Sequence, residues 1–274
     1  MGNFLDTQSP SIDWKVPVAS VFAANSLLWA WCQTKKDNSY VDIMWGLTFI
    51  LPNALMMFQK LQKGQPIDTR SALTNLCIGL WGLRLAYHIG KRHKEEDYRY
   101  VAMRKAWMKG GKTSYYLKSF LIIFVLQAAL SLMVNYNSMK ISAAENAPAL
   151  QWTDYAGWAM FAIGYVMEVV ADKQLSQHIA DPTKGKPKFI QWGLWKYSRH
   201  PNYFGEALIW WGIYLVNCSL PQGWMRIFSP LLMSYLLRFL SGVPMLEKKQ
   251  RKHPEFAAYA AKTNVFVPWF SKEV

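Results

Sequence analysis

The chain has 274 residues, of which 52% are apolar and 15% aromatic, and it carries a formal net charge of +14. This apolar and aromatic content excludes an intrinsically disordered chain, and a count of three cysteines excludes a disulfide-stapled scaffold. The mean hydropathy of -0.01 hides a segregation of apolar and charged residues along the chain.

Seven apolar stretches follow one another, and each is about as long as the 17–25 residues that a helix needs to span a bilayer. They cover residues 16–32, 41–58, 72–90, 116–134, 154–171, 203–219 and 224–243. Buried helices of a soluble bundle are the alternative, but such helices show a polar face about every 3.6 residues. The second, fourth and sixth stretches show almost none. We therefore predict an all-α polytopic membrane protein, with about seven spans in a single domain over residues 1–274.

The basic residues of the loops support this partition. With seven spans, one side of the membrane carries 22 of the 31 Lys and Arg residues, in loops 33–40, 91–115 and 172–202 and after residue 243. The positive-inside rule then places the C-terminus on the cytosolic or matrix side of an endoplasmic reticulum, mitochondrial inner or bacterial inner membrane. Residues 1–13 contain no Arg and resemble neither a cleaved signal nor a transit peptide.

Several ionisable residues lie within or at the ends of these spans, where charge is costly and usually functional. All fall in the half of the bilayer beside the basic loops: Asp42, Arg84, Glu168, Asp172, Glu206 and Arg238. Snorkelling to the interface explains the two arginines, but short carboxylates snorkel poorly. A polar cavity open to the basic side accounts for all six residues together.

The segment 194–206 holds the densest chemistry of the chain. Pro201 suits the first turn of a helix, so the sixth span would begin there with free backbone N–H groups. Arg199 and His200 precede this start, which suits an anionic group such as a pyrophosphate. Asn202 and Glu206 add an amide and an acceptor. A helix start anchored at headgroup level by Arg, Tyr and Trp residues is an equally good interpretation.

The segment after the seventh span begins with the basic run 248–252, which suits solvent or anionic headgroups. Residues 255–270 predict a short interfacial helix followed by an anchoring tail. The net charge alone would allow a nucleic-acid partner, but membrane orientation explains it better. We therefore expect the bilayer, and no nucleic acid, as a partner.

A series of motifs resembles the steroid 5-alpha-reductase family of integral membrane enzymes, and most closely its branch of poorly characterised members. The resemblance covers about residues 41–270. Its pieces are Val41-Asp42-Ile43-Met44-Trp45-Gly46, Trp81-Gly82-Leu83-Arg84-Leu85, Glu95 with Asp97, Arg99 and Tyr100, Glu168 with Ala171 and Asp172, Gly193-Leu194-Trp195, Ser198 through Glu206, and Ser241-Gly242-Val243-Pro244 with Glu247.

The resemblance implies a seven-helix membrane fold that binds NADPH and reduces a carbon–carbon double bond conjugated to a ketone, in a lipid or steroid-like substrate. It implies that Glu206 orients the nicotinamide side. The residues that it implies as cofactor ligands are Arg84, Asp172, Arg199, His200, Asn202, Tyr203 and Arg238. Hydride would go to the enone β carbon while a protein acid polarises the ketone oxygen.

One departure from the family pattern concerns the ketone-binding residues. The characterised steroid reductases use a Tyr of the third helix and a Glu of the second, and here Trp81 aligns with that Tyr. An indole N–H donates a hydrogen bond but is a poor proton donor. Asp42 is a candidate replacement for the Glu, so Asp42, Trp81 and Glu206 are the candidate catalytic residues.

Two other functions remain open from the sequence. Trp81 is consistent with an accessory subunit of a larger membrane complex, such as one of the mitochondrial inner membrane, that keeps the pocket without the reaction. The Arg-His-Pro-Asn-Tyr element also occurs in membrane methyltransferases of the isoprenylcysteine type, which would bind S-adenosylmethionine. Cys32, Cys77 and Cys218 lie in or at the ends of apolar stretches, and no spacing predicts a metal site.

Overall fold

The computed structural model describes residues 12–271 and contains only helices, turns and one isolated β-bridge in this range. Residues 1–11, which include most of the predicted N-terminal tail, lie outside the described part. The chain forms two compact units, residues 1–148 (unit 1) and 149–274 (unit 2). The all-α prediction is confirmed, while the single domain stays a prediction.

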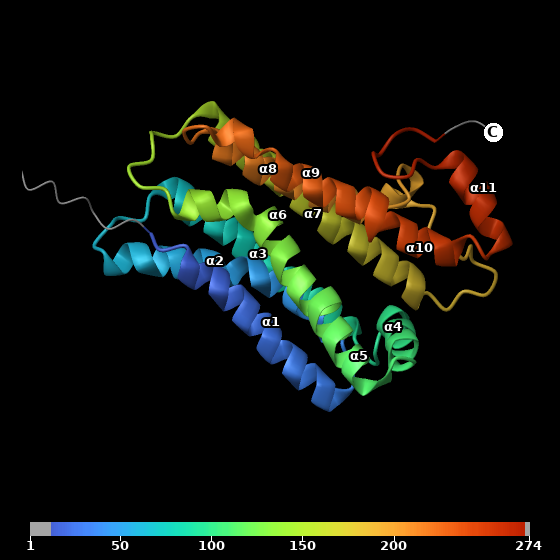
Figure 1. Cartoon of the computed structure of the whole chain (residues 1–274). Helices are drawn as coiled ribbons and strands as arrows, with labels where there is room; N and C mark the ends of the chain where they lie inside the picture. The colour runs from blue at the N-terminus through green and yellow to red at the C-terminus, as the bar shows by residue number, and fades with distance from the viewer. Residues whose placement is uncertain (1–11, 272–274) are drawn as a thin grey trace, which may run out of the picture. The chain divides into compact units, whose positions relative to one another are not determined.

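Unit 1 is built around long helices that pack along one another, with α2 in contact with α1, α3 and α6 (Figure 1). The shorter α4 lies in what the sequence predicted as a polar loop, residues 91–115, and α5 begins in that loop and ends at Lys118, so the prediction missed both helix starts. The helices are α1 (Lys15–Lys35), α2 (Tyr40–Gln62), α3 (Thr69–Arg92), α4 (Tyr98–Met108), α5 (Gly111–Lys118), the π-helix η1 (Ser119–Val125) and α6 (Leu126–Ser142).

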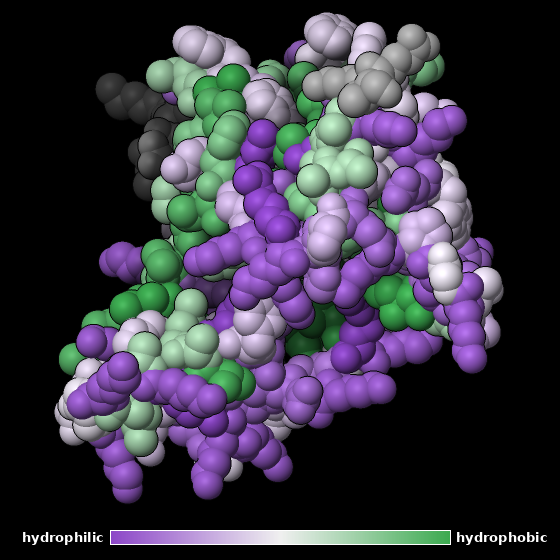
Figure 2. Space-filling model, turned by 90° about the vertical axis from the view of Figure 1, so that its right-hand side faces the viewer, coloured by the Kyte–Doolittle hydropathy of each residue, from purple (hydrophilic) through white to green (hydrophobic). Residues whose placement is uncertain are grey.

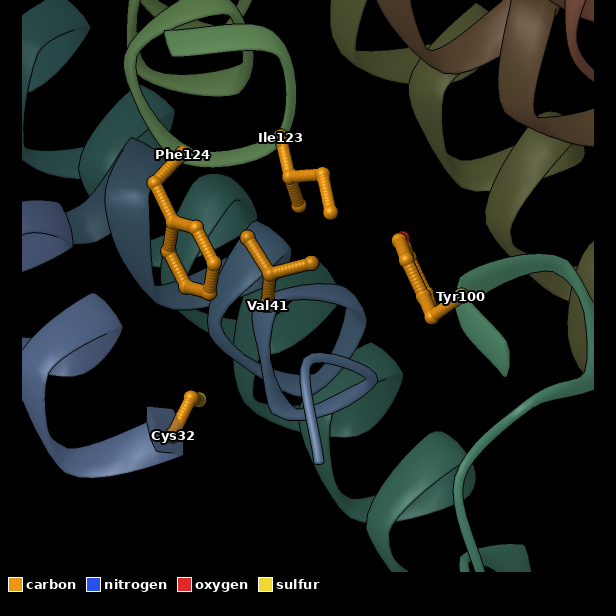
Figure 3. Packing of buried hydrophobic residues seen from close by; sticks show 5 residues of the cluster. All are labelled: Cys32, Val41, Tyr100, Ile123 and Phe124. Atoms are coloured by element: carbon orange, nitrogen blue, oxygen red, sulfur yellow. The ribbon is translucent and has the colours of Figure 1, made fainter. Parts of the chain in front are cut away.

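An apolar cluster joins four elements of unit 1 near the start of α2. Its side chains converge from α1, α2, α4 and η1 (Figure 3). The members are Cys32, Val41, Tyr100, Ile123 and Phe124, all of them at most 5% exposed. Removing this apolar surface from water or lipid headgroups fixes the short α4 against the long helices.

A buried polar network connects α2 to α3 and α6. The amide of Asn53 donates to the side-chain oxygens of Asn135 and Ser138, each at 3.0 Å. Ser142 donates to the Asn53 carbonyl oxygen at 2.9 Å and accepts from Asn75 at 2.8 Å. Side-chain hydrogen bonds of this kind hold helices together where lipid offers no hydrophobic driving force. They hold α2, α3 and α6 in fixed positions relative to one another.

Unit 2 consists of the long α7, the shorter α8 and a third helical segment that packs on α8. The C-terminal helices α10 and α11 follow, as the orange and red end of the chain shows in Figure 1. The elements are α7 (Trp152–Ala180), the 3-10 helix η2 (Gly193–Lys196), α8 (Pro201–Cys218), the 3-10 helix η3 (Gly223–Arg226), α9 (Phe228–Tyr235), the π-helix η4 (Leu236–Leu240), α10 (Val243–Gln250) and α11 (Pro254–Lys262).

Glycines bring α7 and α8 unusually close. A Cβ atom at Gly164 would lie 2.5 Å from the carbonyl oxygen of Gly205, and one at Gly157 would lie 2.6 Å from that of Gly212. The two pairs show that α7 and α8 run antiparallel and touch backbone to backbone, as small residues permit in membrane helices. Gly205 therefore permits the close approach of α7 to α8.

Most residues of each of the seven predicted stretches are helical in the structure, and the exceptions are Ser219, Ile227, Ser241 and Gly242. Three segments are long and apolar enough to cross a membrane by length and composition: Tyr40–Gln62, Gly111–Ser142 and Gly223–Gln250. The second of them, which contains the predicted stretch 116–134, is the most apolar of the three. The chain is thus an all-α membrane protein, and the number of its spans stays a prediction.

Candidate functional site

Asp42, in the first turn of α2, forms hydrogen bonds with two side chains of unit 1. One carboxylate oxygen accepts a 2.7 Å hydrogen bond from the guanidinium of Arg99, and the other accepts one of 2.7 Å from the hydroxyl of Tyr100. Asp97 also accepts from Arg99, at 2.8 Å. Burial and the neighbouring Asp42 carboxylate raise the pKa of Tyr100, so its phenol stays protonated and donates. This cluster joins the starts of α2 and α4.

The predicted catalytic Trp81 lies in the interior of unit 1. Its side chain is 0% exposed and meets the ring of Phe49 edge-on, with centroids 5.0 Å apart. Arg84, one turn further along α3, is half-buried. Burial of this extent makes Trp81 a core residue in the structure, with no surface offered to a substrate.

Asp172 and Asn202 meet where α7 runs beside the first turn of α8. The Asn202 amide nitrogen donates to Asp172 at 3.1 Å. Within residues 12–271 the Asn202 carbonyl oxygen is buried and has no hydrogen-bond partner. Glu168 and Glu206 are also buried in unit 2, at 3% and 8% exposure. Three carboxyl groups and an amide thus lie along the α7–α8 pair. Burying such groups costs free energy unless they form hydrogen bonds.

Arg199 is held by acceptors from the C-terminal part of the chain. Its guanidinium donates to Glu247 at 2.8 Å and to the backbone oxygens of Thr263 and Ala260 at 2.7 and 3.1 Å. Arg199 is 8% exposed and Glu247 is 3% exposed, so water screens this ion pair little. We call Arg199, His200 and Glu247 the buried triad.

His200 completes the buried triad. Its Nε2 atom lies 3.2 Å from the same Glu247 oxygen that Arg199 contacts. Burial lowers the pKa of His200, and the hydrogen bond to Glu247 offsets this only in part. The imidazole is therefore neutral near pH 7 and donates its Nε2 proton to Glu247. Its ring stacks on Tyr203, with centroids 5.5 Å apart.

Residues of the C-terminal segment form hydrogen bonds with residues 195–199, beside the buried triad. The Arg199 backbone N–H donates to the carbonyl of Asn264 at 2.8 Å, within an isolated parallel bridge between Ser198 and Asn264. The Tyr259 hydroxyl donates to the carbonyl of Trp195, and the Trp195 indole donates to that of Ala171. These bonds connect α11, η2 and α7. The predicted helix after the seventh span is confirmed as α11.

Pro201 opens α8 at its first helical position, as the sequence predicted. Arg238 lies in the π-helix η4, half-buried, with its guanidinium 4.9 Å from the ring centroid of Phe239. A π-turn inside an α-helix is rare and frequently marks a functional site. Gly242 follows, and a Cβ there would lie 2.3 Å from the Leu237 carbonyl, so the segment breaks sharply before α10.

The candidate site residues divide between the units. Asp42, Trp81 and Arg84 belong to unit 1, and the others belong to unit 2. The structure brings Asp172 to Asn202 and brings Arg199, His200 and Tyr203 together. A common polar cavity for all of them stays a prediction. Among residues 12–271 there is no group of three or more His, Cys, Asp and Glu residues that could hold a metal ion.

The sequence did not reveal the partners of two candidate site residues, Arg199 and Asp42. Glu247 and Arg99 both appear in the motif series, but neither was a candidate site residue, and each proves to be the counter-ion of one that was. The only available signal was their presence in those motifs, because sequence separations of 48 and 57 residues hide the contacts.

The fold and the buried polar groups define an all-α membrane protein. Residues 28–263 match the family described as "Protein of unknown function (DUF1295)", and the chain belongs to this family. It is similar to the uncharacterized protein C594.04c of Schizosaccharomyces pombe, with 27% identity over 293 residues that cover 97% of this chain and 83% of that protein. No solved structure matches the chain.

Proposed function

We propose that this protein is a membrane-embedded, NADPH-dependent reductase of a lipid or steroid-like enone. The observation that carries the proposal is the Asp172–Asn202 pair, whose amide oxygen is buried without a partner in the described chain. A buried polar atom in this state requires an explanation, and a ligand or a catalytic role is one of those known in native proteins. The motif series that resembles the steroid 5-alpha-reductase family supports the same function.

The residues of unit 2 fit the polar groups of a dinucleotide. The Asn202 oxygen can accept a hydrogen bond from a carboxamide or a ribose hydroxyl, and the Asp172 carboxylate can accept from a second hydroxyl. Bound NADPH would supply a hydride to the β carbon of the enone. The half-buried Arg238 of unit 2 is the proposed phosphate ligand, because the Arg199 guanidinium already binds Glu247 and two carbonyls. A role for Arg84 of unit 1 stays a prediction.

Arg199 and His200 then support the site rather than touch the cofactor. The buried triad fixes the two residues directly before α8, and their position sets that of Asn202. Tyr203, stacked on His200, belongs to the same support. Glu206 remains the proposed residue that orients the nicotinamide side and a candidate catalytic residue. Asp42 is bound by Arg99 and Tyr100.

Seven spans and a C-terminus on the cytosolic or matrix side complete the proposal. The helical segments that contain the seven apolar stretches support it, together with the concentration of basic residues in alternate loops. The substrate would enter from the lipid phase, which is where a steroid-like enone partitions.

The test is equilibrium binding of NADPH to the full-length protein in detergent or nanodiscs. We expect Asn202→Ala to weaken binding about 10-fold, since one buried hydrogen bond is worth about 1–2 kcal/mol. Gln177→Ala is the matched control, because Gln177 also belongs to the α7–α8 region but is exposed. A wild-type protein that retains no NADPH, or an Asn202→Ala variant that binds like wild type, would contradict the proposal.

An accessory subunit that binds the cofactor without reducing a substrate is the second candidate. The complete burial of Trp81 favours it, since the residue aligned with the family's proton donor offers no exposed atom. NADPH binding without oxidation of NADPH by any enone, together with co-purifying membrane subunits, would support it. A stable monomer that turns over an enone would exclude it, and binding of S-adenosylmethionine in place of NADPH would instead indicate a methyltransferase.

A further inference from the structure

A pocket of about 360 Å³ lies between α11 and the loop that follows α7, away from the Asp172–Asn202 pair. The loop contributes Gly185, Lys186, Pro187 and Gln191 to the lining, and α11 contributes Glu255, Ala258, Tyr259 and Lys262. The volume suits a small molecule or one headgroup. We call it the α11 pocket.

The walls of the α11 pocket are held in place by contacts of their own. Phe189 stacks on Tyr259 with centroids 6.2 Å apart and meets Phe256 edge-on at 5.3 Å. The backbone N–H of Lys188 donates to Glu255 at 3.1 Å. The Tyr259 hydroxyl is anchored on Trp195. The contacts of Phe189 and Lys188 thus join the loop that follows α7 to α11.

One ammonium group is fixed at the pocket wall. The Lys186 Nζ atom donates to the carbonyl oxygen of His178 at 2.5 Å and to that of Asp181. Both carbonyls belong to the end of α7, where a cation is favoured. Two of its three donors are used, and the third is left for a ligand. The side-chain entropy of this lysine is already lost, which lowers the cost of binding.

The charge of the pocket favours an anion. Within residues 12–271 no carboxylate pairs with the ammonium group of Lys186 or Lys262. The nearby Asp181 carboxylate accepts from the backbone N–H and the hydroxyl of Thr183, and it also interacts with the charge of Lys186. The two ammonium groups of the lining still outnumber the Glu255 carboxylate. Hydrophilic side chains dominate the face drawn in Figure 2. The pocket lining combines apolar residues with two ammonium groups, those of Lys186 and Lys262, and one carboxylate, that of Glu255.

We propose that the α11 pocket binds a phosphate group carried on a small hydroxylated group, as in glycerol phosphate. Lys186 and Lys262 bind the phosphate as point charges. Gln191 and the Glu255 oxygen opposite the Lys188 contact bind hydroxyls. The same chemistry is offered by the headgroup of phosphatidylglycerol and by free glycerol 3-phosphate. The site is separate from the proposed NADPH site and does not depend on it.

The experiment uses the full-length protein in phosphatidylcholine nanodiscs titrated with glycerol 3-phosphate by calorimetry, and in detergent with added phosphatidylglycerol counted by native mass spectrometry. We expect one bound molecule per chain for at least one probe. The variant Lys186→Gln with Lys262→Gln should weaken its binding roughly 10-fold or more, since each lysine near a phosphate contributes about 1 kcal/mol. Binding of glycerol 3-phosphate identifies a soluble ligand, and binding of phosphatidylglycerol alone identifies a lipid.

The matched control is Lys248→Gln with Lys252→Gln, which removes the same charge from exposed positions of the C-terminal basic run. It should change affinity less than twofold. Equal weakening by both pairs would reduce the effect to bulk charge and overturn the site. Failure of both probes to bind would overturn it as well. If the first pair unfolds the loop, Lys262→Gln alone should still weaken binding several-fold, because that exposed side chain has no structural contact among the described residues. Unphosphorylated glycerol should not compete.

Discussion

At the scale of single residues, the buried charges of this protein mostly satisfy one another. Arg199 faces Glu247 in unit 2, and Asp42 faces Arg99 and Tyr100 in unit 1. Removing one partner of such a pair destabilises the protein strongly, because the other charge stays buried without compensation. Asn202 is different, because its buried amide oxygen has no such partner within residues 12–271. The two situations distinguish residues that support a site from one that can serve a ligand.

We expect Glu247→Leu to destabilise the protein by about 3–5 kcal/mol, because it leaves the Arg199 guanidinium buried without a counter-ion. The double variant Arg199→Met with Glu247→Leu should recover most of this loss, since an apolar pair can replace a buried ion pair. Thermal unfolding in detergent measures both. Additive losses in the double variant would mean that the two side chains do not interact in the folded protein.

A pH effect is expected from Asp68, the residue that caps α3. Burial raises the pKa of its carboxyl, but hydrogen bonds from Ser71 and the charge of Lys60 outweigh burial and lower the pKa below the ordinary value. The stabilisation is therefore complete above the ordinary carboxyl pKa of about 3.9 and is lost as the pH falls through the lower pKa of the folded state.

Asp68→Asn keeps a side chain that can cap a helix but removes the charge beside Lys60, which is 2% exposed. We expect a lower melting temperature than wild type at pH 7 and a difference that shrinks as the pH is lowered toward 3. Glu95→Gln, at an exposed carboxylate, should show no such trend. A difference that is constant with pH would show that the carboxylate charge of Asp68 does not stabilise the fold.

At the scale of helices, the contact between α7 and α8 depends on glycine. Gly164→Leu should cost about 1–3 kcal/mol or more, because its side chain would meet the backbone of Gly205. Gly79→Ala is the control, since a Cβ at that position of α3 meets nothing within 4 Å. It should be neutral or slightly stabilising. Monodispersity and melting temperature in detergent report both, and equal effects would contradict the close approach of the helices.

The helices themselves could be predicted, because long apolar stretches leave few alternatives. Short polar helices could not: α4 lacks an apolar stretch and is held by Tyr100 packing on distant residues such as Val41. The Asp172–Asn202 and Arg199–Glu247 contacts could not be derived either. They depend on how the chain returns to itself over 30 and 48 residues, and one sequence records residue types but no such distances.

At the scale of the whole molecule, the basic residues predict orientation in the membrane. We expect Lys109→Cys and Lys184→Cys, each in a variant that lacks Cys32, Cys77 and Cys218, to react with a membrane-impermeant maleimide from the same side of sealed vesicles. Glu145→Cys should react from the other side. All three introduced positions are exposed. Reaction of Lys109→Cys and Lys184→Cys from opposite sides would contradict the seven-span topology.

The buried triad also affects the order in which unit 2 folds during synthesis. Glu247 is translated 48 residues after Arg199, which is a delay of roughly 2–10 s at ordinary rates of synthesis. Thr263, which supplies a further acceptor, comes 64 residues after Arg199. During this interval the guanidinium has none of these acceptors, so it must remain hydrated or be held by another protein. Residues 195–200 are therefore among the last parts of unit 2 to reach their final structure.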